Sequence, residues 1–291
     1  MSQETAIAWA YTDKFGWQDA AVAGVGVCSP AFLYGETLFE SFRAHQGRWL
    51  ALDEHFGRFE AGITAWDWDC TFDRGQMRIQ LNEGLEKLGR TEAYARLSCW
   101  PSRGSGGPGI LPASESGWLL LVAPLNGGAF LEGPAVRLGI AEKIGRDAWA
   151  LPYALKHGNY LPSIWAAREA RERKLDDLIL CRQDGSPVEA SASNLLVWDE
   201  QDGWLTPTLG RDGLAGIARN ALLRRGVVRE RAIGRKELYR TSAMALVNSV
   251  RGLRFAEAFD DRVLLVEGPS VDVLRNAWQG LIADWLASEE A

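Results

Sequence analysis

The chain has 291 residues, 47% of them hydrophobic and 24% charged, which allows a sizeable buried core and favours two domains over one small module. Its 38 acidic and 32 basic residues give a formal charge of -6 without any basic block, so composition gives no support for a nucleic-acid-binding or anionic-membrane-binding protein. A protein that acts on a small-molecule substrate fits this balance better.

The first part of the chain predicts a mixture of strands and helices. Alternating or β-branched and aromatic segments predict strands, and apolar residues at helical spacing predict helices. The predicted strands are residues 6–11, 38–44, 93–100 and 118–123, and the predicted helices run from residue 53 and from residue 77. We therefore expect a small N-terminal domain over residues 1–123, followed by a linker rich in glycine and proline over residues 124–133.

The remainder, residues 134–291, predicts a larger C-terminal domain with the same mixture. The predicted strands are residues 136–141, 178–182, 194–198 and 204–206, and the predicted helices are residues 161–173, 217–225 and 271–286. The order lacks regular β-α-β alternation and contains no G-x-G-x-x-G after a strand. Both absences disfavour a Rossmann domain.

The N-terminus carries no basic-then-apolar segment, and the longest apolar runs are too short to span a bilayer, so we expect a soluble, cytoplasmic protein. The four cysteines are widely spaced without a C-x-x-C, and only three histidines occur. Neither a disulfide framework nor a zinc site is indicated, and buried free thiols are the simpler interpretation.

Five short motifs follow one another along the chain in an informative order. They are Tyr34-Gly35-Glu36-Thr37-Leu38-Phe39-Glu40-Ser41-Phe42-Arg43, His55-Phe56-Gly57-Arg58-Phe59, Leu155-Lys156-His157-Gly158-Asn159-Tyr160-Leu161, Val188-Glu189-Ala190-Ser191-Ala192-Ser193-Asn194-Leu195 and Gly213-Leu214-Ala215-Gly216-Ile217-Ala218-Arg219. Over about residues 34–254 the chain resembles the class IV, or fold-type IV, pyridoxal-phosphate enzymes. That family contains branched-chain and D-amino-acid aminotransferases and 4-amino-4-deoxychorismate lyase.

The resemblance implies an α+β fold of two domains, like that of the D-amino-acid aminotransferases. It combines a smaller N-terminal α/β sandwich with a larger C-terminal pseudo-barrel domain that carries the Schiff-base lysine. It further implies pyridoxal 5'-phosphate as cofactor and a homodimer whose active site lies at the domain and subunit interface. No nucleic acid or membrane partner is expected.

Lys156 matches the family's Schiff-base lysine, which also acts as general acid and base. Glu189, with Asn194 close behind it, matches the carboxylate that keeps the pyridine nitrogen protonated, although alone it would read as an ordinary charged residue after a turn. Each pKa unit by which a carboxylate favours the protonated ring corresponds to about 1.4 kcal/mol. Tyr160 is predicted either to bond the phenolic oxygen of the ring or only to pack.

The cofactor phosphate requires backbone donors, a helix N-terminus and usually an arginine. The resemblance assigns Gly216, Ile217 and Ala218 to the helix N-terminus and Arg58 to the arginine, and Ser249 adds a hydroxyl. The alternatives are a surface helix charge for Arg58 and a plain turn residue for Ser249.

Two features favour a lyase over an aminotransferase. Ser41 supplies a hydroxyl where aminodeoxychorismate lyases typically carry one and aminotransferases often have glycine. The segment Ser102-Arg103-Gly104-Ser105-Gly106-Gly107 resembles a lyase loop in which the arginine binds a substrate carboxylate. Arg96 and Tyr34 are further candidates for substrate binding, although Arg103 also reads as a solvated loop charge and Arg96 as a structural ion pair.

The sequence thus predicts an aminodeoxychorismate lyase that converts 4-amino-4-deoxychorismate to 4-aminobenzoate and pyruvate in folate biosynthesis. Two alternatives stay open. One is a class IV aminotransferase acting on branched-chain or D-amino acids, because Asn159-Tyr160-Leu161 is equally at home there. The other is a member that has kept the fold without turnover.

Overall fold

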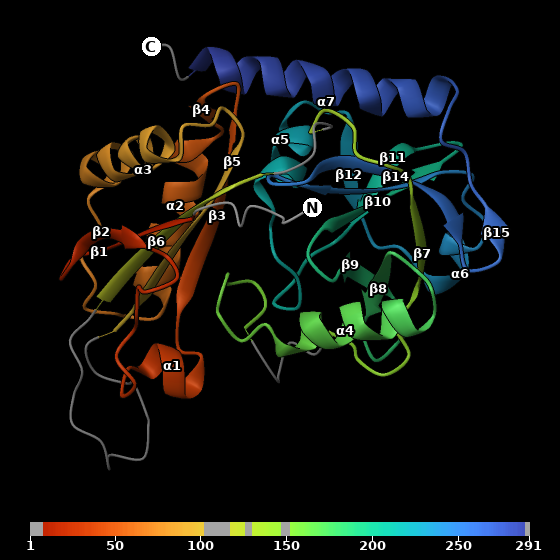
Figure 1. The fold of residues 1–291 in the computed structure, drawn as a ribbon. Coiled ribbons are helices and arrows are strands. Elements are labelled where there is room, and N and C mark those ends of the chain that lie inside the picture. Colours follow the sequence, from red (N-terminus) through yellow and green to blue (C-terminus); the bar gives the residue numbers. More distant parts are fainter. Residues whose placement is uncertain (1–7, 102–116, 126–129, 147–151, 289–291) are drawn as a thin grey trace, which may run out of the picture. The chain divides into compact units, whose positions relative to one another are not determined.

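The computed structural model describes residues 8–101, 117–125, 130–146 and 152–288. Contacts divide the chain into two compact units (Figure 1). The first comprises residues 1–127 together with 156–159, and the second comprises residues 128–155 and 160–289. The division at residue 127 falls inside the predicted linker, but the contacts group Lys156 with the first unit, although its position in the chain suggested the C-terminal domain.

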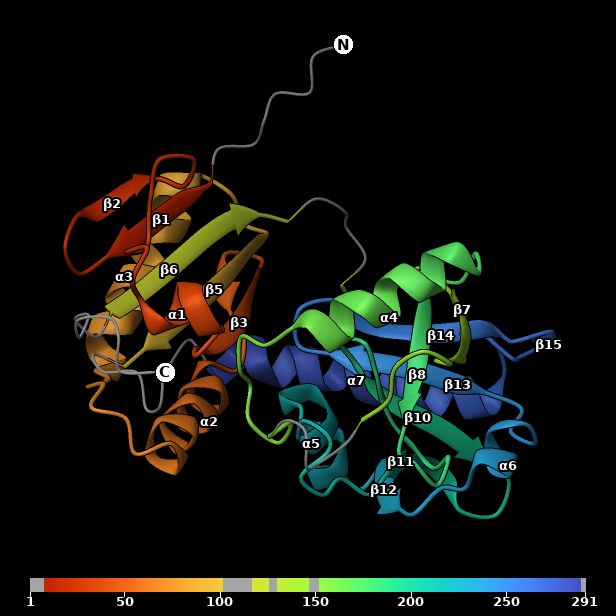
Figure 2. The same cartoon turned by 90° about the horizontal axis from the view of Figure 1, so that it is seen from below.

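The first unit is built on one antiparallel sheet with two long helices on one face and a short helix on the other (Figure 2). Its elements are β1 (Trp9–Thr12), β2 (Gly16–Asp19), α1 (Pro30–Tyr34), β3 (Leu38–His45), β4 (Arg48–Trp49), α2 (Leu52–Ala65), α3 (Arg74–Leu88), β5 (Ala93–Trp100) and β6 (Gly117–Pro124). The strand order is β2-β1-β6-β5-β3-β4. Because β4 pairs with only the last residues of β3, the first half of β3 presents a backbone edge to other segments.

Strand β3 buries residues on both of its faces, including Glu40 and Arg43 among its apolar residues. Phe42 points to α2, where it packs against Phe56 with ring centroids 5.9 Å apart. Edge-to-face aromatic contacts continue from Phe56 to Phe72 and from Phe72 to Phe59. Full burial of such a side chain contributes about 1.5–3 kcal/mol, so this cluster fixes α2 against the sheet.

The second unit is built around a closed arrangement of strands. Its elements are β7 (Val136–Ile140), α4 (Leu161–Glu172), β8 (Asp177–Cys181), β9 (Pro187–Ala190), β10 (Asn194–Asp199), β11 (Gly203–Pro207), α5 (Ile217–Arg224), β12 (Val228–Arg231), α6 (Arg235–Leu238), β13 (Met244–Asn248), β14 (Gly252–Phe259), β15 (Arg262–Val263) and α7 (Pro269–Ser288). The strand order is β12-β11-β10-β13-β14-β7-β8-β9, and β9 also pairs with β10. That extra pairing closes six strands into a barrel, which β11 and β12 extend.

Apolar side chains fill this barrel. Leu138, Ile179, Leu195 and Leu246 come from four different strands of the closed set and are completely buried in one cluster. Outside the barrel, α4 packs on β8, and α5 packs on β13 and α7. The predicted α+β class with a barrel-like sheet is confirmed.

Most predicted elements appear with shifts of one to three residues. The strand predicted from residue 6 begins at Trp9, and the helix predicted over residues 161–173 ends at Glu172. In the described part of the chain, no helix is both long and apolar enough to cross a membrane, and no cluster of three possible metal ligands occurs. Cys70, Cys99 and Cys181 are buried free thiols, as expected, whereas Cys28 is exposed.

Candidate functional site

The segment that carries Lys156 pairs with the open edge of β3. The backbone N–H of Phe39 donates to the carbonyl oxygen of Lys156 at 2.9 Å, and that of Gly158 donates to Thr37 at 2.8 Å. A side chain at Gly158 would bring its Cβ within 2.3 Å of the Thr37 hydroxyl, so the close approach requires glycine. Lys156 is therefore anchored through its backbone to the sheet of the first unit.

The Lys156 amine lies over a face of this sheet that carries polar side chains. Its Nζ is 4.4 Å from the centroid of the Phe39 ring. The register places Ser41 opposite Arg96, so both share that face with Phe39. The Arg96 guanidinium stacks on the Phe39 ring at 3.5 Å, and the Ser41 hydroxyl lies 3.3 Å from that of Tyr94. A primary amine, two hydroxyls and a guanidinium thus meet around one aromatic ring.

A cavity of about 310 Å³ opens beside this group in the first unit. Its lining combines apolar walls with a few polar groups: Val25, Ala31, Phe32, Gly35, Thr37, Arg96, Ser98, Trp100, Leu119 and Gly158. In the described part of the chain, Arg96 pairs with no carboxylate, which speaks against its alternative role as a structural ion pair. A small anionic ligand with an apolar body fits such a cavity.

On the other face of β3, Glu40 binds two side chains of α2. Arg58 donates from Nε to one carboxylate oxygen at 2.7 Å and from Nη2 to the other at 2.8 Å. His55 Nδ1 lies 2.7 Å from the second oxygen. Glu40 and His55 are 0% exposed, whereas the Arg58 side chain keeps 17% of its surface.

This pairing determines the charges of the cluster. Burial alone would raise the pKa of Glu40, but Arg58 and His55 hold it well below its usual range. Burial lowers the pKa of His55, against the opposing attraction of Glu40. Glu40 is therefore ionised and His55 neutral at neutral pH, and the arrangement fixes Arg58 through a two-pronged contact.

In the second unit, Glu189 is held by two donors. Arg146 Nη2 lies 3.0 Å from one carboxylate oxygen, and the backbone N–H of Leu214 donates to the other at 3.2 Å. Arg146 also stacks on the Tyr153 ring at 4.4 Å. Glu189 is nearly buried and keeps its carboxylate oriented by these contacts.

The Glu189 hairpin is tied to the start of α5 by Asn194. Asn194 pairs with Glu189 across the strands and donates from Nδ2 to the Leu214 carbonyl at 2.9 Å. A side chain at Gly216 would bring its Cβ within 2.0 Å of Asn194 Oδ1. Gly216 begins α5 without any side-chain cap, so the first-turn N–H groups at Ile217 and Ala218 keep their donor character at the positive end of the helix.

The remaining predicted residues differ in how they are held. Ser249 lies in the turn after β13. Asn248 Oδ1 accepts from the backbone N–H of Val250 at 3.0 Å and shapes this turn. Asn248 Nδ2 donates to the Ser193 hydroxyl at 2.9 Å and ties the turn to Ser193. Tyr160 precedes α4 without capping it. Tyr34 ends α1 and is 44% exposed. Arg103 lies outside the described residues.

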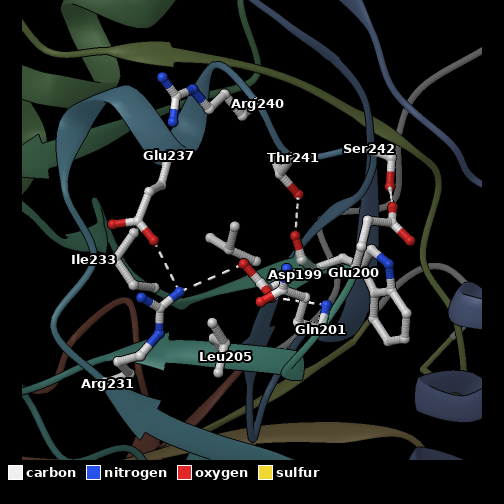
Figure 3. A pocket seen from close by; sticks show the side chains of 12 residues that line it. Asp199, Glu200, Gln201, Leu205, Arg231, Ile233, Glu237, Arg240, Thr241 and Ser242 are labelled. Atoms are coloured by element: carbon white, nitrogen blue, oxygen red, sulfur yellow. Dashed lines mark hydrogen bonds and ion pairs between the residues drawn. The ribbon is translucent and has the colours of Figure 1, made fainter.

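Another pocket, of about 550 Å³ in the second unit, contains none of the predicted residues (Figure 3). Its polar side chains mostly bind one another. Arg231 donates to Glu237 at 2.8 Å, Ser242 donates to Glu200 at 2.8 Å, and Thr241 donates to the Trp198 carbonyl at 2.6 Å. We therefore assign no ligand to it.

Sequence reasoning missed Glu40, His55, Tyr94 and Arg146 as parts of the site. Glu40 offered a signal, because a carboxylate between Leu38-Phe39 and Phe42 in a predicted strand requires a partner if it is buried. His55 lies in a quoted motif but carried no assigned role. Arg146 lies 43 residues before Glu189, and no local pattern joins the two.

Comparisons with known proteins identify the family of this chain. The family model described as "Amino-transferase class IV" matches residues 37–259, and the chain belongs to this family. It is 26% identical over 207 residues to a putative branched-chain-amino-acid aminotransferase of Methanocaldococcus jannaschii, covering 71% of this chain and 70% of that protein. It is also 26% identical over 194 residues to the aminodeoxychorismate lyase of Bacillus subtilis, covering 66% and 65%.

Solved structures give the same fold across nearly the whole chain. A branched-chain aminotransferase from Thermoproteus uzoniensis aligns with a TM-score of 0.81 at 23% identity, covering 96% of this chain and 97% of that one. An aminotransferase from Brucella abortus bound to PLP aligns with a TM-score of 0.82 at 20% identity, covering 98% and 100%. At these identities the likeness establishes the fold, which is the fold-type IV architecture.

Membership of this family makes pyridoxal 5'-phosphate the cofactor. The residues present fit that molecule. An amine for its aldehyde, a buried carboxylate for its ring nitrogen, a rigidly held arginine and an uncapped helix start for its phosphate are all available. Because Asn194 packs against Gly216 where a Cβ would lie, the first residue of this helix start has to be a glycine, which carries no side chain.

Proposed function

We propose that the protein is a 4-amino-4-deoxychorismate lyase, which releases 4-aminobenzoate and pyruvate. The observation that carries the proposal is the Ser41 hydroxyl on the same sheet face as Phe39, whose ring lies under the Lys156 amine. Elimination needs a proton donor for the departing group, and transamination does not. The comparisons favour neither activity over the other, since the lyase and the aminotransferase relatives are each 26% identical to this chain.

In this proposal each chain residue has a task in holding the cofactor. Arg58 and the first-turn N–H groups of α5 bind the phosphate, with Ser249 adding a hydroxyl. Glu189 keeps a proton on the ring nitrogen, while Arg146 and the Leu214 N–H keep its carboxylate ionised and aimed. Tyr160 bonds the phenolic oxygen. When bound, pyridoxal phosphate supplies an electron sink for the substrate carbon that bears nitrogen.

Lys156 and Ser41 move the protons. Lys156 Nζ takes the proton from the carbon that bears nitrogen, and the electron pair of that C–H bond forms the new ring double bond. The C–O bond to the enolpyruvyl group breaks with its electrons on oxygen. Ser41 Oγ, oriented by the Tyr94 hydroxyl, gives the departing enolpyruvate the proton that converts it to pyruvate.

The substrate carries two carboxylates, and the proposal assigns arginines to them. Arg96, unpaired with any carboxylate in the described part of the chain, binds one in the cavity of about 310 Å³. Arg103 binds the other, and Tyr34 contributes from the end of α1. The apolar walls at Phe32, Trp100 and Leu119 suit the carbon ring of the substrate.

The decisive experiment supplies cofactor-loaded protein with enzymatically generated 4-amino-4-deoxychorismate and follows 4-aminobenzoate fluorescence together with pyruvate. Equimolar release of both products supports the lyase. No release with intact cofactor, combined with rapid conversion to the pyridoxamine form by branched-chain or D-amino acids, would identify an aminotransferase instead.

A matched pair of variants tests the proton donor. Ser41→Ala removes the hydroxyl and should slow elimination by roughly a hundredfold without loosening the cofactor, the usual size of a general acid-base contribution. Ser41→Thr keeps the hydroxyl and should retain most of the rate. Equal rates for Ser41→Ala and the native enzyme would remove Ser41 from the mechanism.

The family resemblance also leads us to propose a homodimer. Leu161, Ile164 and Trp165 on α4 are 66%, 58% and 50% exposed, more apolar surface than a solvated helix usually leaves uncovered. Sedimentation of the holoenzyme tests this, and a monomer at micromolar concentration would contradict it.

A further inference from the structure

His55 is a buried titratable residue that the proposed mechanism does not use. It is 0% exposed on α2, where its ring lies 5.0 Å from that of Phe42. Its Nδ1 faces Glu40 at 2.7 Å, and within the described chain its Nε2 finds no hydrogen-bond partner. A buried polar atom without a partner is costly, so the residue requires an explanation.

The surroundings determine which proton the ring carries. Nδ1 faces an ionised carboxylate, which accepts but cannot donate, so Nδ1 must carry a hydrogen atom. Nε2 is buried without a hydrogen-bond partner in the described chain, where a bare lone pair costs less than a second N–H and a second charge. His55 is therefore a neutral donor to Glu40, with Nε2 unprotonated.

That donor acts on the carboxylate which orients Arg58. Glu40 Oε2 accepts from both His55 and Arg58, and Oε1 accepts from Arg58 Nε. The guanidinium has five N–H donors, of which Glu40 takes two. Because His55 also binds this carboxylate, Glu40 holds the plane of the Arg58 guanidinium in one orientation.

We propose that His55 is a positioning residue, which acts through Glu40 to aim Arg58 at the phosphate of the cofactor. The inference rests on the proposed role of Arg58 in binding phosphate. It explains why a polar ring, and not another phenylalanine, occupies this place beside Phe42 and Phe56. If His55 served only to fill space, the volume of its replacement would matter and the donor would not.

Two amide variants separate these alternatives. In His55→Asn the side-chain nitrogen is attached to Cγ, as Nδ1 is, so the donor to Glu40 is kept while volume is lost. In His55→Gln the nitrogen lies one bond further out, where Nε2 was, so volume is better kept while the donor is lost. The readout is the dissociation constant of pyridoxal phosphate from the apoprotein, measured by tryptophan fluorescence.

We expect His55→Gln to weaken cofactor binding by roughly tenfold or more, the effect of losing a buried hydrogen bond to a charged group. We expect His55→Asn to stay within about threefold of the native protein. Equal affinities in the two variants, or weaker binding by His55→Asn than by His55→Gln, would overturn the proposal.

Pyridoxal, which lacks the phosphate, is the matched ligand control. Its affinity should be the same in both variants, and a parallel loss would show a general disturbance of the fold and contradict positioning of Arg58. Arg58→Gln distinguishes failure of this inference from failure of the proposed function. If it leaves the affinity for pyridoxal phosphate unchanged, the phosphate role itself is wrong.

A measurement on the native protein does not depend on the folding of any variant. Nitrogen-15 spectra of the histidine ring should show Nδ1 protonated and Nε2 unprotonated at neutral pH. A ring protonated on Nε2, or on both nitrogens, would refute the proposal.

Discussion

The two units each contain a buried arginine–glutamate pair, and the two pairs are arranged in opposite ways. In the first unit the Glu40 side chain is 1% exposed and its partner Arg58 is 17% exposed. In the second unit Glu189 is 8% exposed and its partner Arg146 is 6% exposed. The proposed cofactor contacts are Arg58 in the first pair and Glu189 in the second, so under this proposal the same kind of ion pair would present a cation in one unit and an anion in the other.

The hydrogen bonds that hold the two carboxylates, Glu40 and Glu189, also differ. Glu40 is enclosed by donors from two side chains, as an anchor for Arg58 requires. Glu189 accepts from the Arg146 side chain and from the backbone N–H of Leu214. We infer that substitutions of Glu40 will act mainly on folding, and that substitutions of Glu189 will act on turnover as well as on folding, because Arg146 is itself buried.

The largest expected effect follows from Glu40→Gln. It removes the charge that neutralises Arg58 inside the protein, and breaking a buried pair in this way costs about 3–5 kcal/mol. Urea denaturation should show a loss of that size in the free energy of unfolding. A loss below about 1 kcal/mol would mean that Glu40 is no anchor.

The next effect is on catalysis. Glu189→Gln keeps the volume and the contact with Leu214 but cannot hold a proton on the ring nitrogen of the cofactor. We expect kcat per bound cofactor to fall by roughly a hundredfold, equivalent to about 2.7 kcal/mol, beside a loss of stability from the unpaired buried Arg146. Turnover within about threefold of native would remove the distinction between the two pairs.

The pH dependence of stability gives a smaller effect in the first pair. The pKa of His55 is lowered from its ordinary 6.5 in the folded protein, so the unfolded chain takes up the proton first. The free energy of unfolding is therefore fully present above about pH 6.5 and falls as the pH drops below it. The charged groups facing the ring are Glu40 on β3, Arg58 on α2 and Lys156.

The lowered pKa of Glu40 adds its own loss only below its ordinary value of 4.5, so between pH 6.5 and 4.5 His55 is the titrating member of this pair. His55→Asn cannot titrate and should flatten the stability profile between pH 6.5 and 4.5. Chemical denaturation across this range measures it, and an unchanged slope in the variant would place the titrating group elsewhere.

The smallest effect is expected at an exposed pair of the same chemistry. Arg74 and Glu60 join α3 to α2 with side chains 42% and 39% exposed, where water and salt screen the attraction. Arg74→Gln should leave thermal unfolding within the error of measurement. A clear destabilisation would show that burial is not what separates Glu40 and Glu189 from ordinary surface pairs.

The sequence predicted best those elements whose pattern is local. The strand at residues 93–100 appears as β5 with the predicted bounds, and α2, α3 and α7 follow their apolar spacing. Strand β13 was missed because its nearly complete burial removes the alternation that marks a half-exposed strand, and β14, which keeps some exposed residues, was missed as well. The short β2 and β12 lie at sheet edges, where few apolar residues are needed.

Residues of the candidate site were also predictable from the sequence where the pattern is local. Lys156, Glu189 and Arg58 could be assigned because each lies in a contiguous motif. The partners of two of them could not, because the pairings of Arg146 with Glu189 and of Glu40 with Arg58 join residues far apart in the chain. Which residues pair across such distances depends on the folded topology and not on any periodicity.

The pairing of residues 156–159 with β3 bears on the order in which the protein assembles during synthesis. The first unit is discontinuous, so a ribosome that has made only residues 1–127 has not yet made the strip that covers the edge of β3. Most of the first unit can condense early, but Lys156 joins it only after the intervening 28 residues of the second unit, 128–155, have been translated. Under the proposed role of Lys156, the nascent chain therefore cannot capture its aldehyde cofactor before that segment has emerged.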